Sequence, residues 1–277
     1  MKRVSSGGGL ARYGLLAAMG ALFVLLGFAQ SRGGRIWEQY EDEMQDPVDD
    51  PADARRKGEF VQGRLRYRSP LDGRGRGGGY ARWGIDANKG DRIFLSILQR
   101  LTRIDVQPVE HIADIDSDDM FNLPWMFAVS VGDWELSAPQ AQRLRKYFDR
   151  GGFLMVDDFH NEEEWAIFMR GMRMIDPAVN IVDLQDSDQA FHVLFDLNER
   201  IRVPGANVVH GSGIERRGVV PHWRAALDAR GRMIVAICFN MDVGDGWEFA
   251  DSPDYPEKFA SEAIRLGANY VLYAMTH

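Results

Sequence analysis

The sequence is poor in cysteine and lacks several common catalytic motifs. Its 277 residues include one cysteine, Cys238, so no disulfide can form within the chain. Because Cys238 lies in the apolar segment 233–239, we expect a small buried side chain and not a reactive thiol. There is no Gly-x-Cys-x-Gly or Gly-x-Ser-x-Gly elbow, no His-x-x-x-His pair and no Gly-Lys-Ser/Thr phosphate loop. These absences argue against a thiol or serine hydrolase, a zinc peptidase and a P-loop nucleotidase.

An excess of positive charge is also missing. The formal net charge is −8, whereas nucleic acids and anionic membrane surfaces require a basic face, so we predict no nucleic-acid partner. The local exception is the arginine- and glycine-rich stretch Gly73–Gly79, followed by Arg82 and Trp83. Arginine forks grip carboxylate or phosphate groups. This stretch is therefore either a cradle for a small anionic ligand or a flexible surface loop.

Only one long apolar run occurs, from Tyr13 to Ala29, and three basic residues precede it. This pattern predicts a signal peptide or membrane anchor over residues 1–29, with a buried helix of the fold as the alternative. With a signal peptide, the rest of the chain would be exported to the periplasm; with an anchor, it would be held at the inner membrane. Residues 30–58 are rich in acids and contain two prolines, which predicts an acidic flexible linker before a folded domain at 59–277.

Apolar patterning in the folded part predicts an α/β fold. Segments typical of strands are 60–67, 124–131, 153–156 and 180–184, and helices are indicated at 91–101, 138–150, after Asn161 and at 257–275. This alternation favours a three-layer α/β/α sandwich with a mostly parallel sheet. The segment 153–156 has no polar face, which places it centrally. Segments 225–227 and 233–239 predict an antiparallel hairpin near the C-terminus.

Two groups of polar residues follow apolar strands, where open α/β sheets place their ligands. After the central strand come Asp157, Asp158 and His160, a candidate catalytic acid–base group that could also serve only to shape the turn. The second group follows 233–239, and its candidate ligand-binding residues are Asn240, Asp242, Asp245 and Trp247. Its carboxylates would suit calcium or magnesium, but the spacing does not match an EF-hand loop. We therefore assign no metal ligand and no cofactor.

Five stretches also carry a family resemblance: Arg82–Asp86, Leu101–Ile104, Gly151–Phe159, Phe239–Trp247 and Gly267–His277. In this order they resemble the bacterial family of domains of unknown function 4159 (DUF4159), from about residue 59 to the end of the chain. The first stretch adds Asp86 to Arg82 and Trp83 as candidate ligand-binding residues.

The resembled family is similar to the class I glutamine-amidotransferase-like fold, whose sheet is flavodoxin-like. True amidotransferases carry a cysteine in the turn after the central strand. Here Asp157, Asp158 and Phe159 occupy that turn, so we do not expect thiol-dependent glutamine hydrolysis.

Two functions stay open from the sequence. The first is a non-catalytic module in the cell envelope that binds a ligand or a protein partner in a degenerate cleft, as the missing thiol and incomplete catalytic set suggest. Members of the resembled family occur near or fused to membrane proteins with von Willebrand factor type A modules, which implies an assembly role by analogy. The second is a hydrolase of a sugar, peptide or amide, in which Asp157 or Asp158 exchanges protons with His160 while Asp242 and Asp245 hold a divalent cation. The hydrolase requires an Asp–His contact, or carboxylates close enough to share a metal ion.

Overall fold

The computed structural model describes residues 35–73, 79–211 and 220–277. The predicted signal peptide or anchor at 1–29 lies outside the described residues, as do positions 74–78 of the arginine- and glycine-rich stretch. Among the described residues, no helix is both long and apolar enough to cross a membrane. The chain divides into two compact units, Met1–Glu38 and Gln39–His277, and the sheet belongs to the second.

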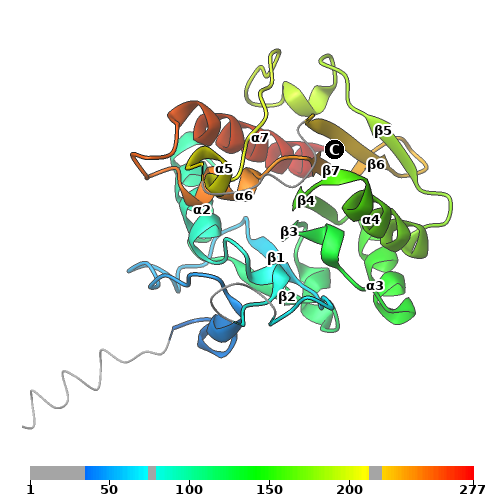
Figure 1. Ribbon diagram of the computed structural model, residues 1–277, viewed down its shortest axis with the longest axis horizontal. Helices are drawn as coiled ribbons and strands as arrows, with labels where there is room; N and C mark the ends of the chain where they lie inside the picture. The colour runs from blue at the N-terminus through cyan, green and yellow to red at the C-terminus, as the bar shows by residue number, and fades with distance from the viewer. Residues whose placement is uncertain (1–34, 74–78, 212–219) are drawn as a thin grey trace, which may run out of the picture. The chain divides into compact units, whose positions relative to one another are not determined.

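The second unit is built around a seven-stranded mixed sheet in the order β2-β1-β3-β4-β7-β6-β5 (Figure 1). The strands are β1 (Gln62–Arg66), β2 (His111–Asp114), β3 (Trp125–Val129), β4 (Phe153–Phe159), β5 (Asn180–Asp183), β6 (His222–Leu227) and β7 (Met233–Phe239). The five strands from β2 to β7 in this order pair in parallel, and the β6 pairings are antiparallel. The mostly parallel sheet and the antiparallel hairpin of β6 and β7 confirm the predicted fold class at this level.

The helices alternate with the strands. They are α2 (Lys89–Leu101), α3 (Ala138–Asp149), α4 (Asn161–Ile175), α5 (Ala206–Val209), α6 (Val243–Glu248) and α7 (Glu257–Thr276), with short 3-10 turns at η1 (Glu38–Glu43), η2 (Arg82–Gly84), η3 (Asp118–Asn122), η4 (Val131–Asp133) and η5 (Gln189–Phe191). Ser137 caps α3 with the predicted capping box. Asn161 accepts hydrogen bonds from the amides of Glu163 and Glu164 at the start of α4. Local capping signals therefore fixed where these two helices begin.

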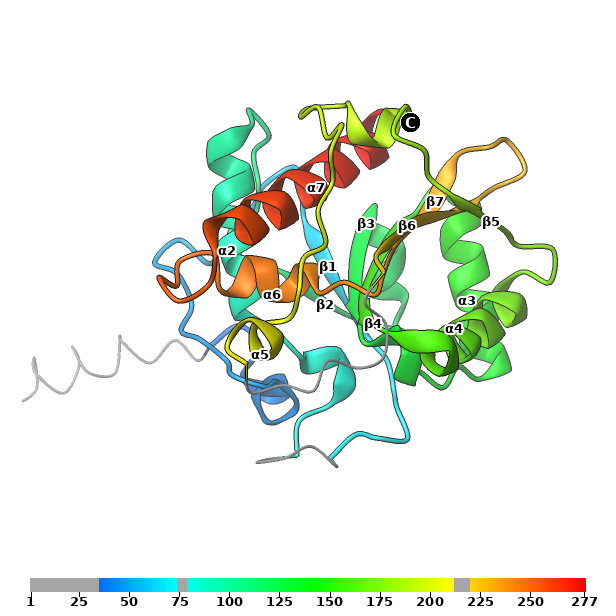
Figure 2. The same ribbon diagram turned by 45° about the horizontal axis from the view of Figure 1, so that its top comes forward.

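Strand β4 lies at the centre of the sheet, as its apolar sequence predicted. It pairs in parallel with β3 on one side and β7 on the other, and Leu154, Met155 and Val156 have no exposed surface. Phe94 of α2 and Trp247 of α6 stack in the core with ring centroids 4.2 Å apart. Figure 2 shows α2, α6 and α7 on one side of β3 and β4, and α3 and α4 on the other. A strand buried in this way delivers its last residues to one edge of the sheet.

Two expectations about the strands need correction. Strand β5 does not pair with β4: it lies at the sheet edge beside β6, and β7 takes the place next to β4. The sequence order could not reveal this, because β7 is the more apolar strand and displaces β5 from the interior. Strand β2 was not predicted, since its sequence His-Ile-Ala-Asp offers only two apolar residues.

From Gln39 onward, the acidic stretch predicted as a linker belongs to the second unit, and polar contacts hold it there. Both guanidinium terminal nitrogens of Arg66 pair with acids, and its Nη2 lies 2.7 Å from Glu43 Oε1. The indole of Trp83 donates to Glu43 Oε2 at 2.7 Å. Further along, Asn88 Oδ1 accepts a hydrogen bond from the amide of Val48. Arginines later in the chain neutralise these acids, an effect that composition alone does not indicate.

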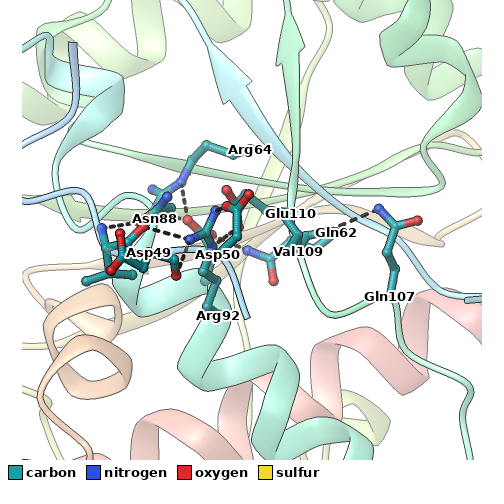
Figure 3. Close-up of polar contacts among 11 residues, drawn as sticks. Asp49, Asp50, Gln62, Arg64, Asn88, Arg92, Gln107, Val109 and Glu110 are labelled. Carbon is teal, nitrogen blue, oxygen red and sulfur yellow. Dashed lines mark hydrogen bonds and ion pairs between the residues drawn. The ribbon is translucent and has the colours of Figure 1, made fainter. Parts of the chain in front are cut away.

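Figure 3 shows the polar network that holds this stretch against α2. Arg92 is 8% exposed, and its guanidinium donates to the carbonyls of Val48 and Asp49 and to the carboxylate of Asp50, each at 2.8 Å. Its Nε lies 3.3 Å from Oε2 of Glu110. A single buried arginine therefore connects the acidic stretch with the turn before β2.

Glu110 should make folding sensitive to pH. Burial, and then repulsion from Asp91, raises the pKa of Glu110 to about 8. Between about pH 4.5 and 8 the unfolded chain releases this proton while the folded chain keeps it, so stability falls as the pH rises. We expect Glu110→Gln to gain about 2–4 kcal/mol relative to the native chain by pH 8, and little below pH 5. Urea unfolding at both pH values measures this gain, and an equal effect at the two would contradict it.

Candidate functional site

The carboxyl ends of β3, β4 and β7 meet at one edge of the sheet, and the backbone there is unusual. Within the described part of the chain, five non-glycine residues have a positive φ between 49° and 63°, and they are Asp86, Ser130, Asp158, Asn161 and Asn240. Four of them follow β3, β4 or β7 or end β4, and the fifth precedes α2. Residues other than glycine seldom adopt this left-handed region of backbone conformation, and those that do concentrate at functional sites. The strain marks this edge as the candidate site.

Asp157 and Asp158 have different hydrogen-bond partners, although they are adjacent at an irregularity of β4. Asp157 has no exposed surface, and its Oδ2 accepts a hydrogen bond of 2.8 Å from the amide of Gly244. It thus stabilises the start of α6 and not α4, the next helix in sequence. Its Oδ1 has no hydrogen-bond partner in the described part of the chain, and burial raises the pKa of Asp157 well above its usual range.

Asp158 links β3 to the residue after β4. Its Oδ2 accepts a hydrogen bond of 2.8 Å from the hydroxyl of Ser130, and its Oδ1 lies 3.1 Å from Nε2 of His160. The predicted Asp–His contact is therefore present. Ser130 was not predicted as a site residue. Its position at the end of an apolar strand was the available signal, but without a partner in sequence it did not stand out.

The second predicted acid group joins Asp86 at the same edge. Asp86, Asp242 and Asp245 each offer one carboxylate oxygen, and these three atoms lie within 4.8 Å of one another. Asp242 caps α6 by accepting a hydrogen bond of 2.9 Å from the amide of Asp245. Asp245 Oδ2 in turn accepts a hydrogen bond of 2.6 Å from the amide of Ala206. Two of the three carboxylates are therefore oriented by backbone amides of α6 and α5.

Asp86 occupies its position because Gly244 has no side chain. A Cβ atom on Gly244 would collide with Oδ2 of Asp86. Asp86 is 3% exposed, and within the described ranges this same Oδ2 has no hydrogen-bond partner. A buried carboxylate oxygen normally has a partner, so an unpartnered one beside two further acids needs an explanation.

The carboxylates of this edge oppose one another's ionisation. Burial raises the pKa of Asp86 well above its usual range, and repulsion from Asp245 and Glu248 adds to it. Burial likewise raises the pKa of Asp242, with repulsion from Asp245 and Asp158 as further causes. Arg64 acts in the other direction on Asp86, but its guanidinium is already paired with Asp91. The group therefore favours binding of protons or of a cation.

The remaining predicted residues lie around this group or beneath it. Arg82 is 3.3 Å from Asp133 of η4. Asn240 accepts a hydrogen bond from the amide of Asn161 and donates to the carbonyl of Val220, so it joins the ends of β7 and β4. Trp83 and Trp247 are 1% and 0% exposed, and the indole of Trp247 donates to Ala263. The two tryptophans thus support the site from the core and are not exposed to a ligand in solution.

Cys238 is buried in β7 with no exposed surface, as predicted. Burial raises the pKa of its thiol well above the usual range, which disfavours the reactive thiolate. Asp157 and Asp158, which we expected in the turn after the central strand, lie within β4.

Comparison with known proteins gives one result. No curated protein matches the chain significantly. The family model described as a domain of unknown function (DUF4159) matches residues 64–275, a range that contains the sheet from Arg64 of β1 onward and every acid of the candidate site. On this match, the chain belongs to the DUF4159 family.

Proposed function

We propose that the domain is a binding module that holds a hard divalent cation, Mg²⁺ or Ca²⁺, between Asp86, Asp242 and Asp245. The observation that carries the proposal is the 4.8 Å limit on the distances among their three carboxylate oxygens. Oxygen ligands lie about 2.1 Å from Mg²⁺ and about 2.4 Å from Ca²⁺, so two on opposite sides of an ion are roughly 4–5 Å apart. One ion could therefore contact all three carboxylates with little movement of the backbone.

A second observation supports a ligand at this place. Oδ2 of Asp86 is buried without a hydrogen-bond partner in the part of the chain that the structure describes, and it lies beside the start of α6, which carries Asp242 and Asp245. A bound cation would satisfy this atom and reduce the repulsion among the carboxylates, at the cost of releasing the protons that they hold. Further coordination positions would be filled by water or by the ligand that the module recruits.

The cation can be tested by thermal unfolding of the full chain after treatment with a chelator. Adding Mg²⁺ or Ca²⁺ should raise the melting temperature, and a concentration of about 100 times Kd should stabilise the fold by about 2.7 kcal/mol. Asp242→Asn retains an oxygen that can cap α6 but should lose this response. Asp118→Asn, whose side chain is 88% exposed, is the matched control and should respond as the native chain does. An unresponsive native chain, or a full response in Asp242→Asn, would refute the site.

We also propose that the fold is a three-layer α/β/α sandwich related to the class I glutamine-amidotransferase-like fold. The strand order β2-β1-β3-β4-β7 supports this. When the five parallel strands are numbered along the chain, β7 is the fifth, and the order becomes the flavodoxin-like 2-1-3-4-5. The proposed module acts in the cell envelope, exported or tethered by residues 1–29, where it would meet a protein partner or a small ligand. Fractionation of bacterial cells that express the full chain, with protease added from outside the inner membrane, tests this location.

A further inference from the structure

We infer that the same edge of the sheet is a hydrolytic centre, in which His160 acts as the general base and Asp158 and Ser130 position it. The inference rests on the proposed cation site and goes beyond it, from binding to catalysis. The substrate that we infer is an uncharged ester or amide, whose carbonyl would be attacked by a water molecule held beside the cation.

The hydrogen bonds specify the role of each residue. Asp158 is an acceptor toward the hydroxyl of Ser130, and its other oxygen faces Nε2 of His160 at 3.1 Å. A carboxylate in this position favours the tautomer with its proton on Nε2, which leaves the lone pair on Nδ1. Among the residues that the structure describes, Nδ1 has no hydrogen-bond partner, although His160 is only 7% exposed. It is therefore a buried nitrogen that can accept a proton.

The positions of the charges connect this pair with the cation ligands. Asp158 interacts electrostatically with Asp86, Asp242 and Asp245. His160 contacts Asp158 directly, so its imidazole lies at the same strand end as these acids. The amide of His160 donates a hydrogen bond of 2.7 Å to the carboxylate of Glu164, and this bond fixes the backbone from which the imidazole projects. The geometry thus brings a proton acceptor and the proposed cation to the same edge.

The substrate class follows from the chemical nature of the side chains. Asp157, Asp158 and Glu248 add three carboxyl groups to the three proposed ligands, and no member of this set carries the positive charge that would bind an anion. An anionic substrate would be repelled by those acids that are ionised, whereas a neutral carbonyl would not. A divalent cation held by the three aspartates would polarise a carbonyl that carries no charge.

The reaction balances with water as the only co-reactant. Nδ1 of His160 takes a proton from the water, and the water oxygen forms a bond to the carbonyl carbon. The bond between that carbon and the alcohol or amine then breaks, and the leaving group receives the proton from His160. The net change is hydrolysis, and His160 ends in its initial state.

Hydrolysis of p-nitrophenyl acetate by the full chain tests the inference, in a chelator and with Mg²⁺ or Mn²⁺ added. The cation should accelerate the reaction, and His160→Asn should lower kcat by about 10²–10⁴-fold, the range that general bases contribute. His192→Asn is the matched control, because His192 also faces an aspartate, at 3.0 Å, but follows η5 and not one of the strands that end at the site. It should hydrolyse the ester at the native rate. p-Nitrophenyl phosphate, which is anionic, should not be hydrolysed.

Ser130→Ala tests the positioning role. It should lower kcat several-fold with KM unchanged, since Ser130 contacts Asp158 and not the substrate, whereas a merely structural role would lower the melting temperature without this split. Cation binding, measured on the same samples, separates the two proposals. Binding without cation-dependent ester hydrolysis would overturn the catalytic inference and leave the binding module intact. If the native chain binds no cation, both proposals are overturned. If the native chain hydrolyses p-nitrophenyl phosphate faster than p-nitrophenyl acetate, the inferred substrate class is overturned.

Discussion

Asp86→Asn is expected to abolish the response to divalent cations and, at the same time, to make the cation-free protein more stable. Oδ2 of Asp86 is buried with no hydrogen-bond partner among the described residues, and nearby carboxylates disfavour its ionisation. Asparagine has the same shape, tolerates the positive φ of 60° at this position and places an N–H group beside the acids. Relief of an unsatisfied buried group should stabilise the cation-free fold by about 1–3 kcal/mol.

The measurement is urea unfolding of the native chain and of Asp86→Asn, with and without Mg²⁺ or Ca²⁺. Without cation, the variant should have the larger free energy of unfolding. With cation, the native chain should have the larger one. Asp118→Asn should change neither, because its carboxylate is exposed and belongs to no acid group at the site. A variant that is less stable in the absence of cation would show that Asp86 serves the fold and not a ligand.

Arg64→Met should destabilise the protein by about 3–5 kcal/mol, the largest single loss that we expect away from the acids of the site. Nε and Nη2 of Arg64 donate to one oxygen of Asp91 at 3.0 and 2.9 Å, and the two side chains are 1% and 0% exposed. The guanidinium also lies 4.9 Å from the centre of the Phe127 ring. Its removal leaves Asp91 buried without its counter-charge, while methionine preserves most of the apolar volume.

Arg145→Met provides the matched comparison. Arg145 also lies 2.9 Å from an aspartate, Asp176, but the side chains are 46% and 36% exposed. Water screens this pair, so its loss should cost less than about 1 kcal/mol. Urea unfolding of both variants measures the difference. The double variant Arg64→Met/Asp91→Leu should recover much of the loss, since no charge is then left buried, and equal losses for the two arginine variants would contradict this explanation.

Much of the fold could be predicted from local patterns. The apolar run from Phe153 to Val156 identified a central strand, and its burial is now evident from its two parallel neighbours. Capping signals at Ser137 and Asn161 located two helix starts. These features depend on a few adjacent residues, and so the sequence contains them directly.

The strand neighbours and the full acid group could not be predicted in this way. Asp86 and Asp242 are 156 positions apart, and β7 lies beside β4 although β5 and β6 come between them in sequence. Ser130 gains its significance from a hydrogen bond to a residue 28 positions later. Such contacts depend on which strands compete for the interior of the sheet, and no local pattern encodes that outcome.

The sequence by itself determined the fold class, the burial of Cys238 and the acidic character of two strand ends, because hydrophobic periodicity and turn chemistry act over short distances. Only the tertiary structure decided that these two strand ends converge with Asp86, that Asp157 accepts a hydrogen bond from Gly244 of α6 and that the two predicted tryptophans belong to the core. The physical reason is that parallel strands far apart in the chain end at the same edge of the sheet. There, packing against glycines such as Gly244 sets which carboxylates approach one another.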